Sequence, residues 1–161
     1  QGFLPRFAAG AQDTALGLVL PEISAIEAYS EETIAIDPAD GTKRVWLIWA
    51  HWCPYCQEEL PMMADWYPPN ADRFPNSELV TVTTAMDPAR GNPLDEYLAD
   101  QQFPLPVLRD EDGKLSAQFG VSAFPFWVIT NGDGTVLYRT AGLLGTDQVE
   151  QLFTQLEQFG S

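Results

Sequence analysis

The chain has few of the residues that metal centres and nucleic-acid-binding proteins depend on. Its 161 residues include two cysteines, one histidine and two lysines, and 23 acidic residues face 8 basic ones, for a formal net charge of −15. Binding to nucleic acid needs clustered Lys and Arg, so the charge argues against a nucleic-acid partner. It would steer a basic partner toward the protein, although a soluble acidic surface explains the same numbers.

Long apolar runs and low-complexity tracts are also absent. No stretch approaches the roughly 18 to 20 apolar residues that span a bilayer. Apolar residues still make up 45% of the chain, with 9 Phe, 5 Tyr and 5 Trp, which suffices for the core of one ordinary domain. The sequence starts at Gln1 rather than Met. We therefore expect any signal peptide or membrane anchor to lie upstream of this chain.

Short apolar runs separated by Pro and Gly predict a single α/β domain. We interpret residues 1–15 as an N-terminal tail or linker and residues 16–161 as the domain. Alternating strands and helices followed by an antiparallel hairpin predict a mixed sheet with helices on both faces. The predicted order begins with a hairpin or edge strand within 16–44, a strand buried on both faces at 45–50, a helix at 54–67 and a strand at 79–86. A helix follows that is capped by Asn92 and has Pro93 at its first position, and then an extended piece at 104–108 and a helix at 114–119. The chain ends with strands at 126–130 and 135–140 and a final helix capped by Thr146. Within the first of these helices, Pro61 is expected to cause a kink and Pro68-Pro69-Asn70 to end it.

Both cysteines and the histidine lie in one stretch, HWCPYCQEELP, at residues 51–61. A structural zinc site needs four ligands, and His51 is the one other Cys or His that joins the two thiols, so no metal is expected from this chain alone. Copper(I) held by the thiolates remains an alternative. A disulfide across so short a loop stabilises a fold little. Thiol–disulfide exchange is the favoured use, with no cofactor besides the redox-active disulfide Cys53–Cys56.

A strand that leads directly into a helix places Cys53 at the helix N-terminus. Unpaired backbone N–H groups and the helix dipole there favour the thiolate over the thiol. Pro54 suits the first helical turn because its missing N–H has no intrahelical partner. Cys56 lies one turn further along and is expected to be more buried. In this hypothesis Cys53 attacks a substrate disulfide and Cys56 resolves the mixed disulfide.

Two titratable residues accompany the cysteines. Glu59 follows Cys56 by three residues, so we expect it on the same side of the helix, where a buried carboxylate can accept or supply the proton of Cys56. The alternative is a solvated carboxylate, which fits its neighbour Glu58 better. His51 is interpreted as a partly exposed loop residue that, if protonated, would stabilise the Cys53 thiolate.

These residues resemble the active site of the thioredoxin superfamily. Residues 52–56 (Trp-Cys-Pro-Tyr-Cys), after an apolar strand and before Pro61, match its strand–turn–helix, and Phe124-Pro125 matches the cis-proline before its terminal hairpin. The resemblance implies a thioredoxin-like fold, a central mixed β-sheet flanked by helices. It also implies that Pro125 lies opposite the cysteines and that the backbone of Phe124 pairs with the substrate chain like an added strand.

Within the superfamily the chain is most similar to the extracytoplasmic TlpA/ResA branch, which includes the reductases of cytochrome c maturation. Residues 59–61 (Glu-Leu-Pro) resemble that branch's acidic residue and proline, and residues 107–125 resemble its stretch before the cis-proline. The 72 positions between Cys53 and Pro125 leave room for an extra strand–helix insert. The similarity covers residues 20–158.

This resemblance implies a thiol-disulfide oxidoreductase that acts on protein disulfides outside the cytoplasm, either periplasmic or anchored to a membrane and facing outward. Nothing in the sequence demands more than a monomer, so a monomer is expected. The resemblance favours a reductase supplied by a membrane or soluble electron-transfer partner. A disulfide oxidase or isomerase of secreted proteins is the alternative enzyme.

Three positions depart from the family pattern. Leu47 stands where thioredoxins carry a buried Asp, which leaves Glu59 as the candidate proton acceptor. Pro54-Tyr55 replaces the Gly-Pro of thioredoxin, and Phe124 is bulkier than the usual residue before the cis-proline. We expect Trp52, Pro54, Tyr55, Phe124 and Pro125 to bind substrate. With Trp127, unless that residue is core, the aromatic members would form a wide apolar surface that suits an extended polypeptide.

Overall fold

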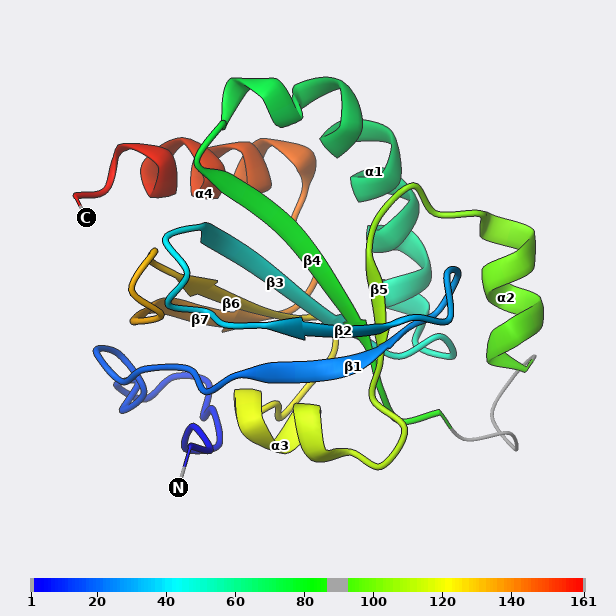
Figure 1. The fold of residues 1–161 in the computed structure, drawn as a ribbon, viewed down its shortest axis with the longest axis horizontal. Helices are drawn as coiled ribbons and strands as arrows, with labels where there is room; N and C mark the ends of the chain where they lie inside the picture. Colours follow the sequence, from blue (N-terminus) through cyan, green and yellow to red (C-terminus); the bar gives the residue numbers. More distant parts are fainter. Residues whose placement is uncertain (1, 87–92, 161) are drawn as a thin grey trace.

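The computed structural model describes residues 2–86 and 93–160, and within them seven strands form one mixed sheet in the order β2-β1-β5-β4-β3-β6-β7 (Figure 1). Helices α1 and α4 lie on one face and α3 lies on the other, which confirms the predicted architecture. The elements are β1 (Ile23–Glu27), β2 (Thr33–Ile36), β3 (Lys43–Trp49), α1 (Pro54–Asn70), the 3₁₀ turn η1 (Ala71–Arg73), β4 (Ser77–Thr83), α2 (Leu94–Gln101), β5 (Val107–Arg109), α3 (Lys114–Phe119), β6 (Phe126–Thr130), β7 (Val136–Ala141) and α4 (Thr146–Gln158).

The central strand β3 is buried along its whole length, as its apolar run predicts. It pairs in parallel with β4 and antiparallel with β6. Successive side chains point to opposite faces of a strand. Leu47 and Trp49 therefore pack under α1, α2 and α4, whereas Trp46 and Ile48 pack against α3 and the N-terminal segment. The two cores meet at the strand that leads into the cysteines.

The predicted strand–helix insert consists of α2 and β5. Strand β5 pairs in parallel with β4 and antiparallel with β1, so it connects the β1–β2 hairpin to the rest of the sheet. Pro93 is the N-cap of α2 rather than its first helical residue. The predicted cap, Asn92, lies outside the described residues.

Two predicted helix ends are wrong. Helix α1 continues through Pro68 and Pro69 to Asn70. The prolines fall in its last turn, where the Asn70 side-chain amide donates to the Trp66 carbonyl oxygen at 2.7 Å and η1 takes over the chain. At α4 the N-cap is Gly145, and Thr146 is the first helical residue rather than the cap.

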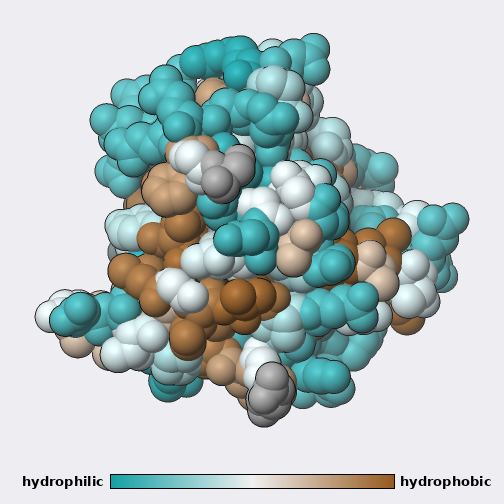
Figure 2. Space-filling view, turned by 60° about the vertical axis from the view of Figure 1, so that its left-hand side comes forward, coloured by the Kyte–Doolittle hydropathy of each residue, from teal (hydrophilic) through white to brown (hydrophobic). Residues whose placement is uncertain are grey.

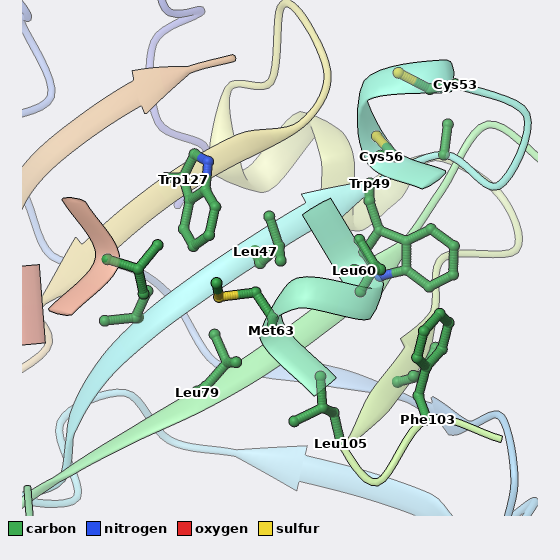
Figure 3. Close-up of a cluster of buried hydrophobic side chains, with 14 of the residues drawn as sticks. Leu47, Trp49, Cys53, Cys56, Leu60, Met63, Leu79, Phe103, Leu105 and Trp127 are labelled. Atoms are coloured by element: carbon green, nitrogen blue, oxygen red, sulfur yellow. The ribbon is translucent and has the colours of Figure 1, made fainter. Parts of the chain in front are cut away.

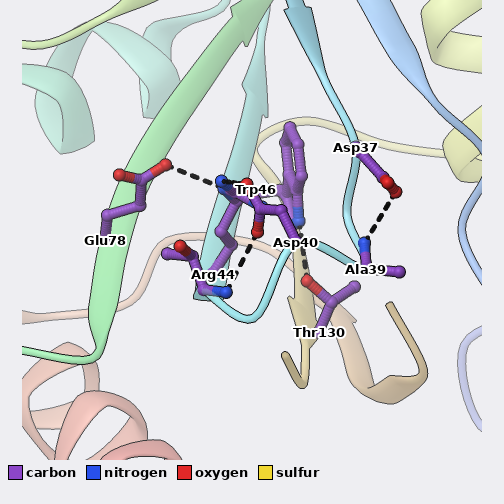
Figure 4. A network of polar contacts seen from close by, with 8 residues as sticks. Asp37, Ala39, Asp40, Arg44, Trp46, Glu78 and Thr130 are labelled. Atoms are coloured by element: carbon purple, nitrogen blue, oxygen red, sulfur yellow. Dashed lines mark hydrogen bonds and ion pairs between the residues drawn. The ribbon is translucent and has the colours of Figure 1, made fainter. Parts of the chain in front are cut away.

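Strand β3 begins with two basic residues, Lys43 and Arg44, which the apolar run at 45–50 did not predict as part of the strand. Arg44 is buried and pairs with Asp40 and Glu78, each at 2.7 Å (Figure 4). Lys43 is also buried, and its ammonium group donates to three backbone carbonyls at the end of α4, those of Leu156, Glu157 and Phe159. Both cations therefore stabilise the fold from inside.

Residues 2–15, expected as a tail or linker, form no helix or strand, yet they pack against the domain. The amides of Leu4 and Phe7 donate to carbonyls at the end of α3, each at 2.9 Å. The fully buried guanidinium of Arg139 donates to both carboxylate oxygens of Asp13 and to the Pro5 carbonyl. These contacts fasten the segment to α3 and β7.

Two surface regions near β7 carry apolar side chains. Leu16, Leu18 and Val19 are exposed. A groove of about 640 Å³ runs between β7 and α4, with Leu137 and Leu152 among its lining residues. Figure 2 shows apolar side chains gathered in a band on this face of the molecule. The cysteines do not line this groove.

Candidate active site

The two cysteines occupy the start of α1, as the sequence predicts. Cys53 is the N-cap of the helix and Pro54 is its first residue. Both thiols are free, and Figure 3 shows them on the first turn of α1, above the core. Cys53 is 8% exposed and Cys56 is 0% exposed. The helix thus presents one sulfur near the surface and keeps the second beneath it.

The fold brings Phe124-Pro125 to this helix end. The peptide bond between these residues is cis, which confirms the predicted cis-proline. The Cys53 thiol donates to the Phe124 carbonyl oxygen at a distance of 3.9 Å. The backbone just before Pro125 therefore lies within reach of whatever binds to Cys53.

Aromatic side chains surround Cys53. The rings of Trp52 and Phe124 meet edge to face with centroids 6.1 Å apart, and the Trp52 indole N–H donates to the Ala85 carbonyl at 2.8 Å. Tyr55 is 60% exposed, and Pro54 is also exposed. Trp127 does not join them, because it is fully buried in the core and donates to the Gly142 carbonyl.

A cleft of about 490 Å³ opens beside this aromatic pair. Its walls come from the Cys53 loop, the end of β4, the β5–α3 loop and the residue before the cis-proline, and it is lined by Trp52, Thr84, Ala85, Met86, Asp110, Glu111, Asp112, Gly113, Ser116 and Phe124. One side of the cleft is aromatic and another is acidic. It is wide enough for side chains of an extended polypeptide bound at Cys53.

Glu59 is buried beside the cysteines, so the alternative of a solvated carboxylate is wrong for it and holds for the exposed Glu58. The Leu144 amide donates to one carboxylate oxygen of Glu59 at 2.5 Å, and the other has no hydrogen-bond partner among the described residues. Burial raises the pKa of Glu59 to about 7, against the lowering effect of the Leu144 N–H, and the charge of Glu58 adds to the rise. Such a carboxyl group exchanges protons near neutral pH.

Burial also raises the pKa of the Cys56 thiol well above its ordinary value, and the neighbouring Cys53 and Glu59 add to the effect. Cys56 is therefore a protonated thiol at neutral pH. It needs a nearby proton acceptor before it can act as a nucleophile.

His51 is buried, so the prediction of a partly exposed loop residue is wrong. Its ring lies 6.4 Å from that of Tyr97 on α2, and its backbone carbonyl accepts a hydrogen bond from the Gln57 side chain. The insert helix covers the histidine, which local sequence does not reveal. The sequence gives no sign that Tyr97 packs against His51, because the spacing around Tyr97 indicates only an apolar helix face. Leu47, at the position of the thioredoxin Asp, is fully buried.

Residues 2–86 and 93–160 lack two kinds of feature. No group of three or more His, Cys, Asp or Glu side chains there is arranged to hold a metal ion. No helix in the same residues has the length and apolar character to cross a membrane.

Comparison with known proteins identifies one family and several relatives. The sequence profile of the AhpC/TSA family matches residues 16–139. Sporulation thiol-disulfide oxidoreductase A of Bacillus subtilis (strain 168) is 23% identical over 150 residues, which are 93% of this chain and 89% of the relative. Thiol-disulfide oxidoreductase ResA of Bacillus cereus (strain ATCC 10987) is 26% identical over 109 residues, 67% of this chain and 60% of the relative.

Solved structures give the same answer for the fold. The crystal structure of StoA from Bacillus subtilis superposes with a TM-score of 0.69 at 23% identity, covering 83% of this chain and 96% of that one. This likeness confirms the predicted thioredoxin-like fold, and the similarity to ResA confirms the predicted branch of the superfamily.

Proposed function

Because the chain belongs to the AhpC/TSA family, we propose that it is a thiol-disulfide oxidoreductase that acts on protein disulfides through Cys53 and Cys56. One observation carries the proposal. The near-surface sulfur of Cys53 lies at a helix N-terminus and contacts the carbonyl before the cis-proline, while the Cys56 sulfur lies buried one turn below. This arrangement supplies an attacking thiol, a resolving thiol and a strand edge for the substrate.

The first step is an attack by the Cys53 thiolate on one sulfur of a substrate disulfide. The bond from Cys53 to that sulfur forms, the substrate S–S bond breaks, and the other substrate sulfur leaves with the electron pair. Cys53 is the N-cap of α1, so it lies beside the unpaired backbone N–H groups of the first helical turn. The product is a mixed disulfide.

The second step resolves this mixed disulfide. Cys56 gives its proton to Glu59 and attacks the Cys53 sulfur; the Cys53–Cys56 bond forms, and the remaining substrate sulfur leaves as a thiolate. Two electrons pass to the substrate, so a reducing partner must restore the dithiol. Glu59 suits the acceptor role because its second oxygen is unpaired and its pKa is about 7.

The substrate site is formed by Trp52, Pro54, Tyr55, Phe124 and Pro125. An extended polypeptide would pair with the Phe124 backbone in the manner of an added strand. The edge-to-face pair of Trp52 and Phe124 would then contact the residues that flank the target cysteine.

We propose that electrons flow from this protein to its substrates, in an extracytoplasmic compartment, with the chain acting as a monomer and recharged by a membrane or soluble partner. The resemblance of residues 59–61 and 107–125 to the TlpA/ResA branch supports the direction and the compartment. A disulfide oxidase or isomerase of secreted proteins uses the same two sulfurs in the opposite direction. The potential of the pair separates the two directions.

The test is the reduction potential of the Cys53–Cys56 pair, measured against glutathione or dithiothreitol buffers by tryptophan fluorescence, since Trp52 adjoins Cys53. A value near −250 mV or lower supports a reductase, whereas one between about −180 and −120 mV indicates an oxidase or isomerase. The absence of any reversible couple would contradict the proposal and make copper(I) titration the next experiment.

Two variants assign the roles of the sulfurs. We expect Cys53→Ser to abolish the reduction of insulin disulfides, because the attacking thiol is lost. Cys56→Ser should accumulate a mixed disulfide that mass spectrometry detects, because Cys53 still attacks but nothing resolves the product. Equal residual activity in both variants would contradict these assignments.

A further inference from the structure

A buried carboxylate lies in the wall of the cleft beside Cys53, and neither step of the exchange reaction uses it. Asp110 is 2% exposed and directly follows β5. Its Oδ1 accepts from the Leu115 amide at 3.0 Å, and its Oδ2 accepts from the Ser116 amide at 2.9 Å. Oδ2 also accepts from the Thr84 hydroxyl at 2.7 Å. The side chain therefore joins the start of α3 to the end of β4, and both segments line the cleft.

The contact with Thr84 fixes the chain just before a rarely adopted backbone conformation. Ala85 has a φ of 53°, in the left-handed region that residues other than Gly, Asn and Asp seldom visit. A residue stays in this region only where the surrounding structure determines its conformation. The Thr84 amide donates to the Trp49 carbonyl at 2.9 Å and its hydroxyl donates to Asp110. Thr84 is thus held by both its backbone and its side chain, which sets the direction of the Ala85 carbonyl.

The Ala85 carbonyl binds the aromatic wall of the cleft. It accepts from the Trp52 indole N–H at 2.8 Å, and the Trp52 ring meets that of Phe124 edge to face with centroids 6.1 Å apart. Trp52 directly precedes Cys53 in the chain. A continuous series of contacts therefore leads from the buried carboxylate of Asp110 to the indole beside the attacking sulfur.

We propose that Asp110 and Thr84 are positioning residues that set the orientation of the Trp52 indole and thereby the fit of a polypeptide substrate in the cleft. The inference rests on the proposed function, and it concerns the binding of substrate rather than the exchange of disulfides. A substrate chain at Cys53 contacts the indole with the residues that flank its target cysteine. Misplacement of the indole weakens this contact.

Thr84→Val tests the inference in the full chain, because it keeps the shape of the side chain and removes the hydroxyl. The amides of Leu115 and Ser116 still donate to Asp110, so the start of α3 is kept. Reduction of insulin is followed at rising insulin concentrations with dithiothreitol as the reductant. We expect KM for insulin to rise about fivefold, as for the loss of one aromatic contact, and the effect to fall on KM rather than on kcat. Thr84→Ser retains the hydroxyl and should retain the wild-type KM.

A spectroscopic measurement reports on the indole itself. Trp52 is one of five tryptophans, so protein labelled with 5-fluorotryptophan gives five fluorine resonances, and Trp52→Phe identifies the one that belongs to Trp52. We expect Thr84→Val to move or broaden this resonance. The resonances of the fully buried Trp46 and Trp127 should stay in place.

Thr81→Val is the matched control. Thr81 is a buried residue of β4 whose hydroxyl donates to the Pro106 carbonyl at 2.8 Å, so this substitution also removes one hydrogen bond from a buried threonine. Thr81 does not line the cleft. Both Val variants should lose similar stability in urea. Thr81→Val should nevertheless keep the wild-type KM and the wild-type Trp52 resonance.

The possible outcomes separate the inference from the proposed function. Either an unmoved Trp52 resonance or a wild-type KM in Thr84→Val would overturn the inference, as would an equal rise of KM in Thr81→Val. If the wild type itself failed to reduce insulin, the proposed function would fail, while the fluorine resonance would still show whether Thr84 orients the indole.

Discussion

At the scale of single residues, the site depends on the carboxyl group of Glu59, which is placed where burial raises the free energy of its ionised form. Glu59 is fully buried on a helix face that it shares with Cys56, Leu60 and Met63. Hydrogen bonding to the Leu144 amide offsets only part of the lost hydration, so its pKa stays raised at about 7. A surface carboxylate, ionised throughout the neutral range, would be a weaker proton acceptor for a buried thiol.

The placement of Glu59 predicts how stability depends on pH. The folded-state pKa is about 7 and the ordinary value is 4.5. Between these values the folded protein holds a proton that the unfolded chain has lost, so its stability falls as pH rises from 4.5 to 7. Glu59→Gln cannot ionise and still accepts from Leu144. We expect the reduced variant to equal the wild type below pH 4.5 and to exceed it by up to about 3 kcal/mol above pH 7.

Urea denaturation between pH 4 and 9, in the presence of a reductant, measures this difference. Glu58→Gln is the control, because the exposed Glu58 adds only a minor part of the Glu59 shift. Glu59→Gln should also slow resolution of the mixed disulfide despite its greater stability. Stability curves that run parallel from pH 4 to 9 would show that Glu59 is ionised in the folded protein at ordinary pH.

At the scale of elements, the strand that leads to the active site also secures the last helix. Helix α4 has no basic residue in its own last turn, where unpaired carbonyls accumulate. Lys43, the first residue of β3, supplies the missing cation and donates to the carbonyls of Leu156, Glu157 and Phe159 at 3.0, 3.2 and 2.7 Å. Strand β3 therefore holds α4 at one end and Cys53 at the other.

Lys43→Met keeps most of the apolar stem and removes the ammonium group. We expect the free energy of unfolding to fall by about 2 kcal/mol, because hydrogen bonds from a charged donor are lost in a buried place. Urea denaturation measures the loss, and amide hydrogen exchange should speed up in the last turn of α4. The exposed Lys114 provides the comparison, and Lys114→Met should change stability by less than about 0.5 kcal/mol. Equal effects of the two substitutions would refute a capping role for Lys43.

The sequence predicted those helices, strands and turns that are determined by residues close together along the chain. The run at 45–50 gave β3, Pro54 marked the start of α1, and the Asn-Gly-Asp-Gly turn at 131–134 gave the β6–β7 hairpin. Each depends on residues that are neighbours along the chain. Cys53, Cys56, Glu59 and the cis-proline were predictable for a second reason, because their spacing matches a known family.

Features that depend on which distant element covers a residue were not predictable. His51 is buried because α2 lies over it, and residues 2–15 pack against the domain because Arg139 and α3 hold them. Lys43 is a strand residue inside the protein because α4 ends beside it. Tyr97 packs against His51 because of where α2 lies, for which the sequence offers only an apolar helix face.

At the scale of the whole molecule, most of the described basic residues bind other groups of the protein. Arg44, Arg73, Arg109 and Arg139 form ion pairs, and Lys43 caps α4. Among the described acidic side chains only Glu59 and Asp110 are buried. Most of the negative charge from 23 acidic and 8 basic residues in 161 therefore lies at the surface. Self-repulsion of this kind destabilises a compact state relative to the expanded unfolded chain.

Salt should therefore stabilise the protein. Between 0.02 and 0.5 M NaCl the range of electrostatic interactions shrinks from about 20 Å to about 4 Å, so repulsion across the surface is screened while ion pairs at contact distance lose less. If screening raises the free energy of unfolding by about 1 kcal/mol, the melting temperature rises by about 2–4 °C for a chain of this size. The double substitution Glu31→Gln and Glu32→Gln, at two exposed positions, should raise the melting temperature at low salt and shrink the gain from added NaCl. A melting temperature that falls with salt in the wild type would mean that the ion pairs of Arg44, Arg73, Arg109 and Arg139 outweigh the repulsion, and that the acidic surface costs the fold nothing.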